Sequence, residues 1–191
     1  MALLPLLHRD VGRPLFLPAH GRGSALPAAM RRLLKRPAGL WDLPELPALG
    51  GPLENDGAVA DSQRAAADAM RVNRCWYGVN GATGLLQAAL LGISRPGEAV
   101  LMPRNAHRCL IQACLLGQLT PLLFDLPYKP DRGHPAPADG PWLESVLAAL
   151  PAEHPPISAA VLVHPTYQGY GLDPAPLIRS LQQRGWPVLV D

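Results

Sequence analysis

The chain has 191 residues, which is enough for one domain with a sizeable core. Its formal net charge is +2 and only 17% of its residues are charged, which argues against a basic nucleic-acid-binding surface. No apolar run reaches the roughly 20 residues that a membrane helix needs, and the first ten residues lack the basic segment and full apolar core of a signal peptide. The composition therefore predicts a globular protein without a nucleic-acid or membrane partner.

The three cysteines, Cys75, Cys109 and Cys114, lie in apolar stretches without a C-x-x-C spacing. This pattern is typical of reduced, buried thiols in a cytoplasmic protein rather than of a disulfide framework. The basic residues are unevenly divided, because fifteen are arginine and only two, Lys35 and Lys129, are lysine.

Residues 1–57 are expected to form an N-terminal arm. Within the arm, residues 24–36 (SALPAAMRRLLKR) predict a short amphipathic helix, with Ser24 as its cap and Gly39 as its stop. Pro-rich extended pieces surround this helix.

Residues 58–191 open with an Ala-rich helix at 58–72 and then alternate short apolar runs with helical stretches. The expected strands are 74–79, 99–102, 119–124, 159–163 and 187–190, and the expected helices between them are 83–92, 106–117, 142–150 and 174–185. Asp173 and Gly185 are placed to cap and to end the last helix, whereas 125–141 is expected to be a long Pro-rich loop. The alternation predicts parallel βαβ units in a three-layer α/β/α sandwich with a mostly parallel sheet.

Ligands of such sheets bind beyond the carboxyl ends of the strands. The segment VNGATG (79–84) follows the first expected strand, and its small residues and Thr83 present N–H groups and a hydroxyl to an anion at a helix start. It lacks the glycine spacing of a dinucleotide fingerprint or a P-loop. An ordinary tight turn with Thr83 as a helix cap explains the segment as well.

Two further segments follow expected strands. In PRNAHRC (103–109), Asn105 is placed to cap the next helix and His107 to stack on a planar ligand, although a half-buried surface histidine is the simpler interpretation. HPTYQGYG (164–171) is a constrained loop whose hydroxyls can point into the site, and turn chemistry alone explains it equally well.

Asp191 ends the last expected strand. A carboxylate at the tip of a buried strand is costly unless a cation pairs with it, and a protonated pyridine nitrogen would be such a cation. The alternative is that the given sequence simply ends there.

These segments, in this order, resemble the Orn/Lys/Arg decarboxylase family, whose members are pyridoxal phosphate (PLP) enzymes of the aspartate-aminotransferase fold, fold type I. FLPAHGRG resembles the family's P-G-H-x-x-G opening, and WDLPELPALGGPLEN its D-x-x-E-x-x-x-L-D-x-L stretch. VNGATG is similar to its phosphate loop, PRNAHRC to its R-N-x-H-K segment, HPTYQGYGLD to its P-T-Y-x-G loop, and VLVD to the start of its V-D-E-A-H-G motif. Ala19 and Arg108 depart from the pattern, standing where the family has glycine and lysine.

The resemblance implies PLP as the cofactor. His107 would stack on its ring, Asp191 would pair with the pyridinium nitrogen, and Thr166 would line the cofactor's edge; His107 and Asp191 are the expected catalytic residues. Four residues would hold the phosphate: Gly81, Ala82, Thr83 and Gly84.

The family pattern continues past Asp191 to an S-x-H-K segment with the Schiff-base lysine, for which neither Lys35 nor Lys129 is a plausible substitute. The chain is therefore expected to be an N-terminal fragment, with 58–191 as the first half of the PLP-binding major domain. The implied activity is decarboxylation of lysine, ornithine or arginine in polyamine or diamine synthesis, by a homo-oligomer when full length. A PLP-dependent aminotransferase and a non-catalytic remnant or regulator stay open as alternatives.

Overall fold

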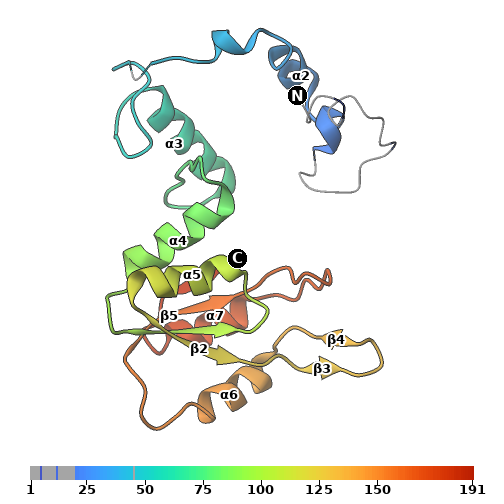
Figure 1. Cartoon of the computed structure of the whole chain (residues 1–191), viewed down its shortest axis with the longest axis vertical. Helices are drawn as coiled ribbons and strands as arrows, with labels where there is room; N and C mark the ends of the chain where they lie inside the picture. The colour runs from blue at the N-terminus through green and yellow to red at the C-terminus, as the bar shows by residue number, and fades with distance from the viewer. Residues whose placement is uncertain (1–4, 6–11, 13–19, 45) are drawn as a thin grey trace. The chain divides into compact units, whose positions relative to one another are not determined.

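The computed structural model describes residues 5, 12, 20–44 and 46–191 (Figure 1). The chain divides into two compact units, Met1–Trp76 and Tyr77–Asp191. The arm boundary predicted after residue 57 stays a prediction. The part of the family resemblance that falls on residues 16–19, including the substitution at Ala19, lies outside the described residues.

Among residues 20–44 and 46–76 of the first unit, the helical elements are η1 (Gly21–Gly23), α2 (Ala28–Leu33), η2 (Ala38–Leu40) and α3 (Ala58–Met70). The helix predicted at 24–36 is present in part, but its predicted ends are wrong. The Ser24 hydroxyl donates to the Gly21 carbonyl at 2.7 Å and is thereby engaged in the preceding turn, so that Pro27 occupies the cap position of α2. Gly39 lies within η2 rather than at the end of α2.

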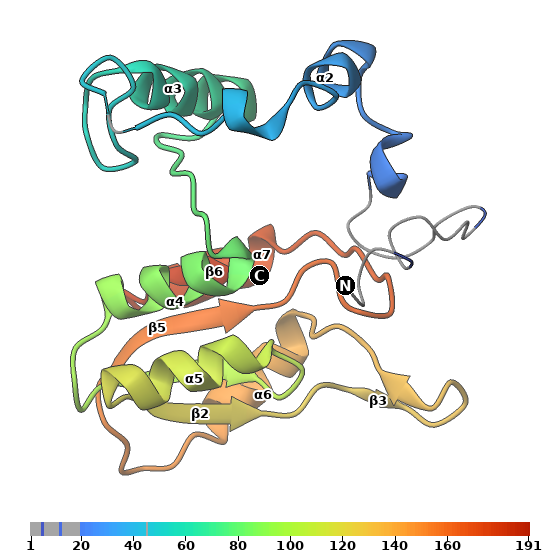
Figure 2. The ribbon, with the colours of Figure 1, turned by 45° about the horizontal axis from the view of Figure 1, so that its top comes forward.

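The second unit is built on a parallel sheet of four strands: β1 (Ala99–Pro103), β2 (Thr120–Phe124), β5 (Ile157–Leu162) and β6 (Val188–Val190). Their order across the sheet is β2-β1-β5-β6, and Figure 2 shows β2 and β5 running in the same direction. Four helices flank the sheet: α4 (Gly81–Ile93), α5 (Arg108–Gly117), α6 (Gly140–Ala148) and α7 (Ala175–Gln182). The predicted α/β fold with a parallel sheet is confirmed.

Two apolar layers hold this unit together, one on each face of the sheet. Successive residues of β1 and β5 point to opposite faces, so that Val100 packs against α4 and α5 while Leu101 packs against α6 and α7. The first layer contains Leu90, Val100, Met102, Cys109, Leu110, Ala113, Cys114, Leu119, Ala159 and Val161. The second contains Leu101, Phe124, Leu143, Ala160, Leu162 and Leu181. Because both faces are covered, the central strands are apolar without alternation, as parallel sheets require.

The strand register sets where the site can form. Leu101 lies opposite Leu122 of β2 and opposite Ala160 of β5, and Ala160 lies opposite Val188 of β6. All four strands therefore end at the same edge of the sheet. Pro121, which cannot donate to a ladder, lies in β2 at one side of the sheet, where such a residue is tolerated.

Two predictions for residues 58–191 are wrong. Residues 74–79 form no strand, since no described strand pairs with them, and Trp76 and Val79 are exposed. The loop predicted at 125–141 contains a short antiparallel hairpin of β3 (Tyr128–Lys129) and β4 (His134–Pro135), with Gly133 in its turn at φ +69°.

The predicted start of the last helix is confirmed, because the Asp173 carboxylate accepts from the Ala175 N–H at 3.0 Å. Gly185 lies three residues beyond the end of α7 at φ +80°. Among the helices of the described ranges, none is long and apolar enough to cross a membrane.

Two leucines of α5 are expected to differ strongly in how much they stabilise the fold, because Leu110 is fully buried and Leu116 is 70% exposed. Leu110→Ala is expected to lower the free energy of unfolding by about 2–5 kcal/mol through lost burial and the cavity left behind. Leu116→Ala is expected to change it by about 0.5 kcal/mol or less. Urea unfolding of both variants, followed by circular dichroism, checks this contrast; equal losses would contradict the packing of α5 against the sheet.

Candidate functional site

The N-terminus of α4 offers unpaired backbone donors. Asn80 precedes the helix and its side chain makes no capping hydrogen bond, and the first turn contains no acidic residue. Gly81, Ala82 and Thr83 are exposed, and Gly81 has φ +65°, which an L side chain rarely adopts. The N–H groups of this turn and the helix dipole can therefore bind an anion. The Thr83 hydroxyl is a further hydrogen-bond donor, which suits a phosphate in particular.

His107 is the N-cap of α5, in the loop that follows β1. Its Nδ1 accepts the Cys109 backbone N–H at 3.2 Å. Because Nδ1 is the acceptor, the neutral ring carries its proton on Nε2. The predicted cap, Asn105, is therefore wrong: His107 takes this role, because it lies two residues closer to the helix.

Asp191 follows β6 at the same edge of the sheet. Its backbone N–H donates to the Leu162 carbonyl at 2.9 Å, and its carbonyl accepts the His164 N–H at 2.8 Å. These bonds fix the backbone of Asp191 beside the end of β5, and its side chain is half-buried.

Cys109 lies in the first turn of α5, close to residues of α4 and to Asp191. The sequence analysis did not identify it as a site residue. Its backbone N–H donates to His107 Nδ1. Burial raises the pKa of the Cys109 thiol, and the negative charge of Asp191 raises this pKa further. The Thr83 side chain lowers the pKa of the thiol, an effect smaller than the two that raise this pKa. The structure therefore brings Thr83, His107 and Asp191 together around one buried side chain. The sequence feature that could have identified Cys109 is its position two residues after His107, in the first turn of the predicted helix.

Thr166 lies at the same edge, in the loop after β5, but its contacts are different. Its N–H donates to the Tyr170 carbonyl at 3.0 Å, and its hydroxyl accepts the Tyr170 N–H at 3.2 Å. Arg132, from the turn between β3 and β4, donates to the Tyr170 hydroxyl at 3.2 Å. The buried Thr166 is thus held within its own loop, which the hairpin supports.

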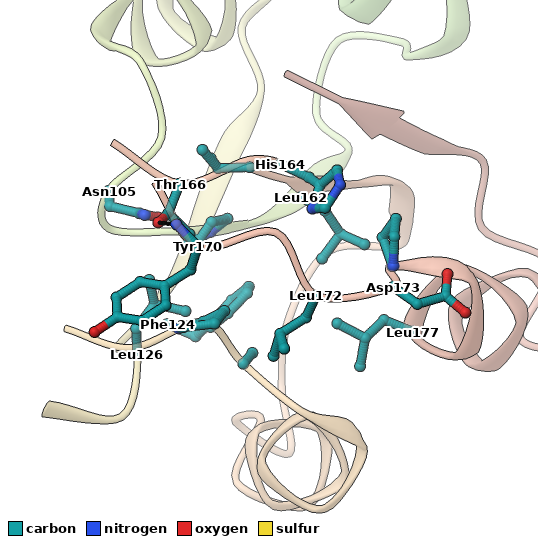
Figure 3. A pocket seen from close by; sticks show the side chains of 15 residues that line it. Asn105, Phe124, Leu126, Leu162, His164, Thr166, Tyr170, Leu172, Asp173 and Leu177 are labelled. Carbon is teal, nitrogen blue, oxygen red and sulfur yellow. Dashed lines mark hydrogen bonds between the residues drawn. The ribbon is translucent and has the colours of Figure 1, made fainter. Parts of the chain in front are cut away.

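A cavity of about 40 Å³ lies beneath this loop, with Asn105, Thr166 and Tyr170 among its lining residues (Figure 3). Phe124, Leu162 and Leu177 make its apolar wall. Asn105 Oδ1 is buried without a hydrogen-bond partner among the described residues. A volume of this size admits roughly one or two water molecules, whereas ligand pockets measure about 300–1,000 Å³. The cavity is therefore too small for an amino acid or a cofactor.

The capping role of His107 predicts how two substitutions differ in stability. His107→Ala removes the acceptor of the Cys109 N–H and is expected to lower the free energy of unfolding by about 1 kcal/mol. His107→Asn supplies another capping acceptor and is expected to stay within about 0.3 kcal/mol of the wild type. Denaturant unfolding without added ligand measures both. If the two variants lose the same stability, the ring does not cap α5.

Comparisons with known proteins give the family of the chain. The family model for the Orn/Lys/Arg decarboxylase major domain matches residues 40–191. Arginine decarboxylase of Halalkalibacterium halodurans is 27% identical over 179 residues, which cover 92% of this chain and 35% of the relative. Arginine decarboxylase of Bacillus subtilis is 25% identical over 175 residues, with the same two coverages. The chain thus spans about a third of the length of these relatives.

Solved structures agree on the fold. The SepCysS–SepCysE N-terminal domain complex matches with a TM-score of 0.59 and 16% identity over 71% of this chain and 36% of that chain. The constitutive lysine decarboxylase of E. coli matches with a TM-score of 0.55 and 19% identity over 87% of this chain and 24% of that chain. With the family model covering most of the sequence, the chain belongs to the Orn/Lys/Arg decarboxylase family and carries part of its major domain.

Proposed function

We propose that the protein encoded by this gene decarboxylates a basic amino acid with pyridoxal phosphate, and that this chain supplies the non-covalent part of the cofactor site. The observation that carries the proposal is the meeting of Thr83, His107 and Asp191 around Cys109 at one edge of the sheet. Family membership supports the same activity.

The phosphate would bind at the start of α4. The exposed first turn has no side-chain cap and no acidic residue, so its N–H groups are available to an anion and the dipole favours negative charge. Gly81, Ala82, Thr83 and Gly84 would form this anchor, with the Thr83 hydroxyl as an added donor.

The ring would lie between His107 and the sheet edge, with its nitrogen towards Asp191. When bound there, the cofactor would supply an electron sink for the decarboxylation. Asp191 would hold the proton on the ring nitrogen through its negative charge, and the capped imidazole of His107 would offer a fixed flat surface. The Thr166 hydroxyl already accepts from Tyr170, so its own proton is free to be donated at the cofactor's edge.

Among the basic amino acids, arginine is the first substrate to test. The two relatives described above are arginine decarboxylases matched over 92% of the chain, whereas the ornithine decarboxylase of Haemophilus influenzae matches over only 60 residues. The product would be a polyamine precursor. A cytoplasmic homo-oligomer, without a nucleic-acid or membrane partner, completes the proposal.

The cofactor part of the proposal is tested on the 191-residue chain alone. Equilibrium dialysis is expected to show PLP binding that Thr83→Val and Asp191→Asn weaken, because they remove a phosphate donor and the ring's counter-charge. Reduction with borohydride and peptide mapping are expected to label neither Lys35 nor Lys129 specifically. An unchanged affinity for PLP in both variants would contradict this site. Strong labelling of one lysine would contradict non-covalent attachment.

The reaction is tested on the protein expressed from the natural gene. Release of CO2 is expected with arginine in preference to lysine or ornithine. Asp191→Asn is expected to lower kcat by roughly tenfold or more, since each pKa unit of lost coupling to the ring nitrogen is worth about 1.4 kcal/mol.

Asp173→Asn is the matched control, because asparagine still caps α7 and this carboxylate is engaged by Ala175. Near-normal turnover of Asp191→Asn would exclude Asp191 as the ring partner. Transamination without CO2 release would favour an aminotransferase, and PLP binding without any turnover would favour a non-catalytic regulator.

A further inference from the structure

The loop that carries Thr166 is held together largely through one residue, Tyr170. Thr166 is only 7% exposed. Its N–H donates to the Tyr170 carbonyl at 3.0 Å, and its carbonyl accepts the Gly169 N–H at 2.8 Å. The Tyr170 N–H donates back to Thr166 Oγ1 at 3.2 Å. Since this last bond ends on the side-chain oxygen, the direction of the Thr166 hydroxyl depends on where Tyr170 lies.

Tyr170 is in turn held from outside its loop. Nη1 of Arg132, which lies 38 residues earlier in the chain, donates to the Tyr170 hydroxyl at 3.2 Å. The ring centroids of His134 and Tyr170 are 5.6 Å apart and the ring planes are tilted by 56°, an arrangement in which aromatic rings attract each other. Two residues of the β3–β4 hairpin thus contact Tyr170, one at its hydroxyl and one at its ring.

The hairpin gives these two contacts a fixed base. Gly133 has φ +69°, and its N–H donates to the Lys129 carbonyl at 2.9 Å, which closes a turn that most side chains would strain. After β4, the Ala136 N–H donates to the Pro127 carbonyl at 2.6 Å. Ala136 and Ala138 are both buried, so the return strand is anchored to the body of the unit.

The inner side of the Thr166 loop offers less support than the hairpin does. The cavity of about 40 Å³ lies beneath the loop, and Tyr170 lines it together with Asn105 (Figure 3). Asn105 Oδ1 has no hydrogen-bond partner among the described residues. Side chains beside a cavity lack the contacts that close packing would provide. The position of Tyr170 therefore depends more strongly on Arg132 and His134.

Arg132 can be changed without disturbing the core. Its side chain is 60% exposed, and its Nε lies 3.7 Å from a carboxylate oxygen of Asp131, which is exposed as well. Exposed ion pairs of this kind contribute little to stability. A substitution at Arg132 should therefore act on the Thr166 loop rather than on the fold.

We propose that Arg132 is a positioning residue for the cofactor's edge: its hydrogen bond fixes Tyr170, and Tyr170 fixes the Thr166 hydroxyl in the direction in which it donates to the cofactor. A threonine hydroxyl has one proton and two acceptor lone pairs, so it can accept from the Tyr170 N–H and donate to a ligand at the same time. The inference rests on the proposed function, since Thr166 meets the cofactor only in the site proposed there.

The test measures the Kd for PLP by equilibrium dialysis of the 191-residue chain. Arg132→Met keeps the aliphatic length without a donor, and Arg132→Lys keeps one donor group. Tyr170→Phe removes only the hydroxyl that accepts from Arg132, so that the ring contact with His134 stays. Thr166→Val removes the hydroxyl proposed to meet the cofactor. Circular dichroism establishes that each variant folds.

The expected result is a loss of affinity that depends on the Thr166 hydroxyl. Arg132→Met and Tyr170→Phe should each weaken PLP binding roughly threefold to tenfold, the value of one hydrogen bond. The double variant should lose no more, because both changes remove the same bond. Arg132→Lys should restore part of the affinity. In the background of Thr166→Val, Arg132→Met should leave the Kd within about 1.5-fold, which a purely structural role of Arg132 would not produce.

Limited proteolysis with chymotrypsin gives a second readout, which needs no cofactor. Tyr167 lies in the same loop and is 69% exposed. The rate of cleavage after Tyr167, mapped by mass spectrometry, reports how often the loop leaves its bound position. Cleavage should be severalfold faster in Arg132→Met and Tyr170→Phe than in the wild type.

Arg184→Met is the matched control, because the Arg184 side chain also donates hydrogen bonds, but to Glu144 and Ser180 rather than to the Thr166 loop. It should change neither the Kd for PLP nor the cleavage after Tyr167.

Three results would overturn the inference while leaving the proposed function intact. They are an unchanged affinity and cleavage rate in Arg132→Met, faster cleavage with unchanged affinity, and an equal loss of affinity with threonine or valine at position 166. A Thr166→Val variant that binds PLP as the wild type does would overturn the contact of Thr166 with the cofactor, and the inference with it. A wild type that binds no PLP would overturn the cofactor site itself.

Discussion

The parallel pairing of β1 with β5 is the constraint on which the rest of the second unit depends. These strands are more than fifty residues apart in sequence, yet Leu101 lies directly opposite Ala160. Because β5 also pairs in parallel with β6, the residues that follow β1 and β6 must emerge at one edge. His107 and Asp191, separated by most of the unit in sequence, share that edge for this reason alone. The shared position of these two residues is thus a consequence of strand direction and register, and ligands of parallel sheets bind at this edge.

The first turn of α5 converts this common edge into a defined site. His107 caps the helix with the same ring that is proposed to meet the cofactor, so that ring orientation and helix stability depend on one hydrogen bond. Cys109 packs under the turn and faces α4. A site assembled in this way needs few long side chains, because short residues at helix ends are held by the backbone itself. The conformational entropy of these residues is therefore lost when the sheet folds, and little more is lost when a ligand binds.

The sequence predicted the strands correctly where a continuous apolar run indicates a strand that is buried on both faces of the sheet. The strands β1, β2, β5 and β6 and their parallel arrangement were predicted from the alternation of apolar runs with helical stretches along the sequence. It failed at 74–79, where β-forming side chains have no described strand to pair with; strand propensity reports a preference, whereas a strand needs a neighbour. It also chose Asn105 over His107 as the cap, because capping depends on where the first turn begins, and helix ends are poorly marked by sequence. The roles of the site residues came from family resemblance rather than from any local pattern.

The chain has only two lysines. In the proposed function this distinguishes non-covalent recognition of the cofactor from its covalent attachment to a lysine. Arginine keeps its proton under all ordinary conditions, so the fifteen arginines of the chain cannot replace the lysine that the family attaches to its cofactor. Lys35 follows α2 in the first unit, and Lys129 pairs with His134 in the hairpin. What the second unit offers instead is a helix terminus, a capped imidazole and a carboxylate, which in the proposed function would act through position or charge rather than through a covalent bond. In the proposed function, recognition of the phosphate and control of the ring proton therefore reside in residues 81–191, independently of covalent attachment.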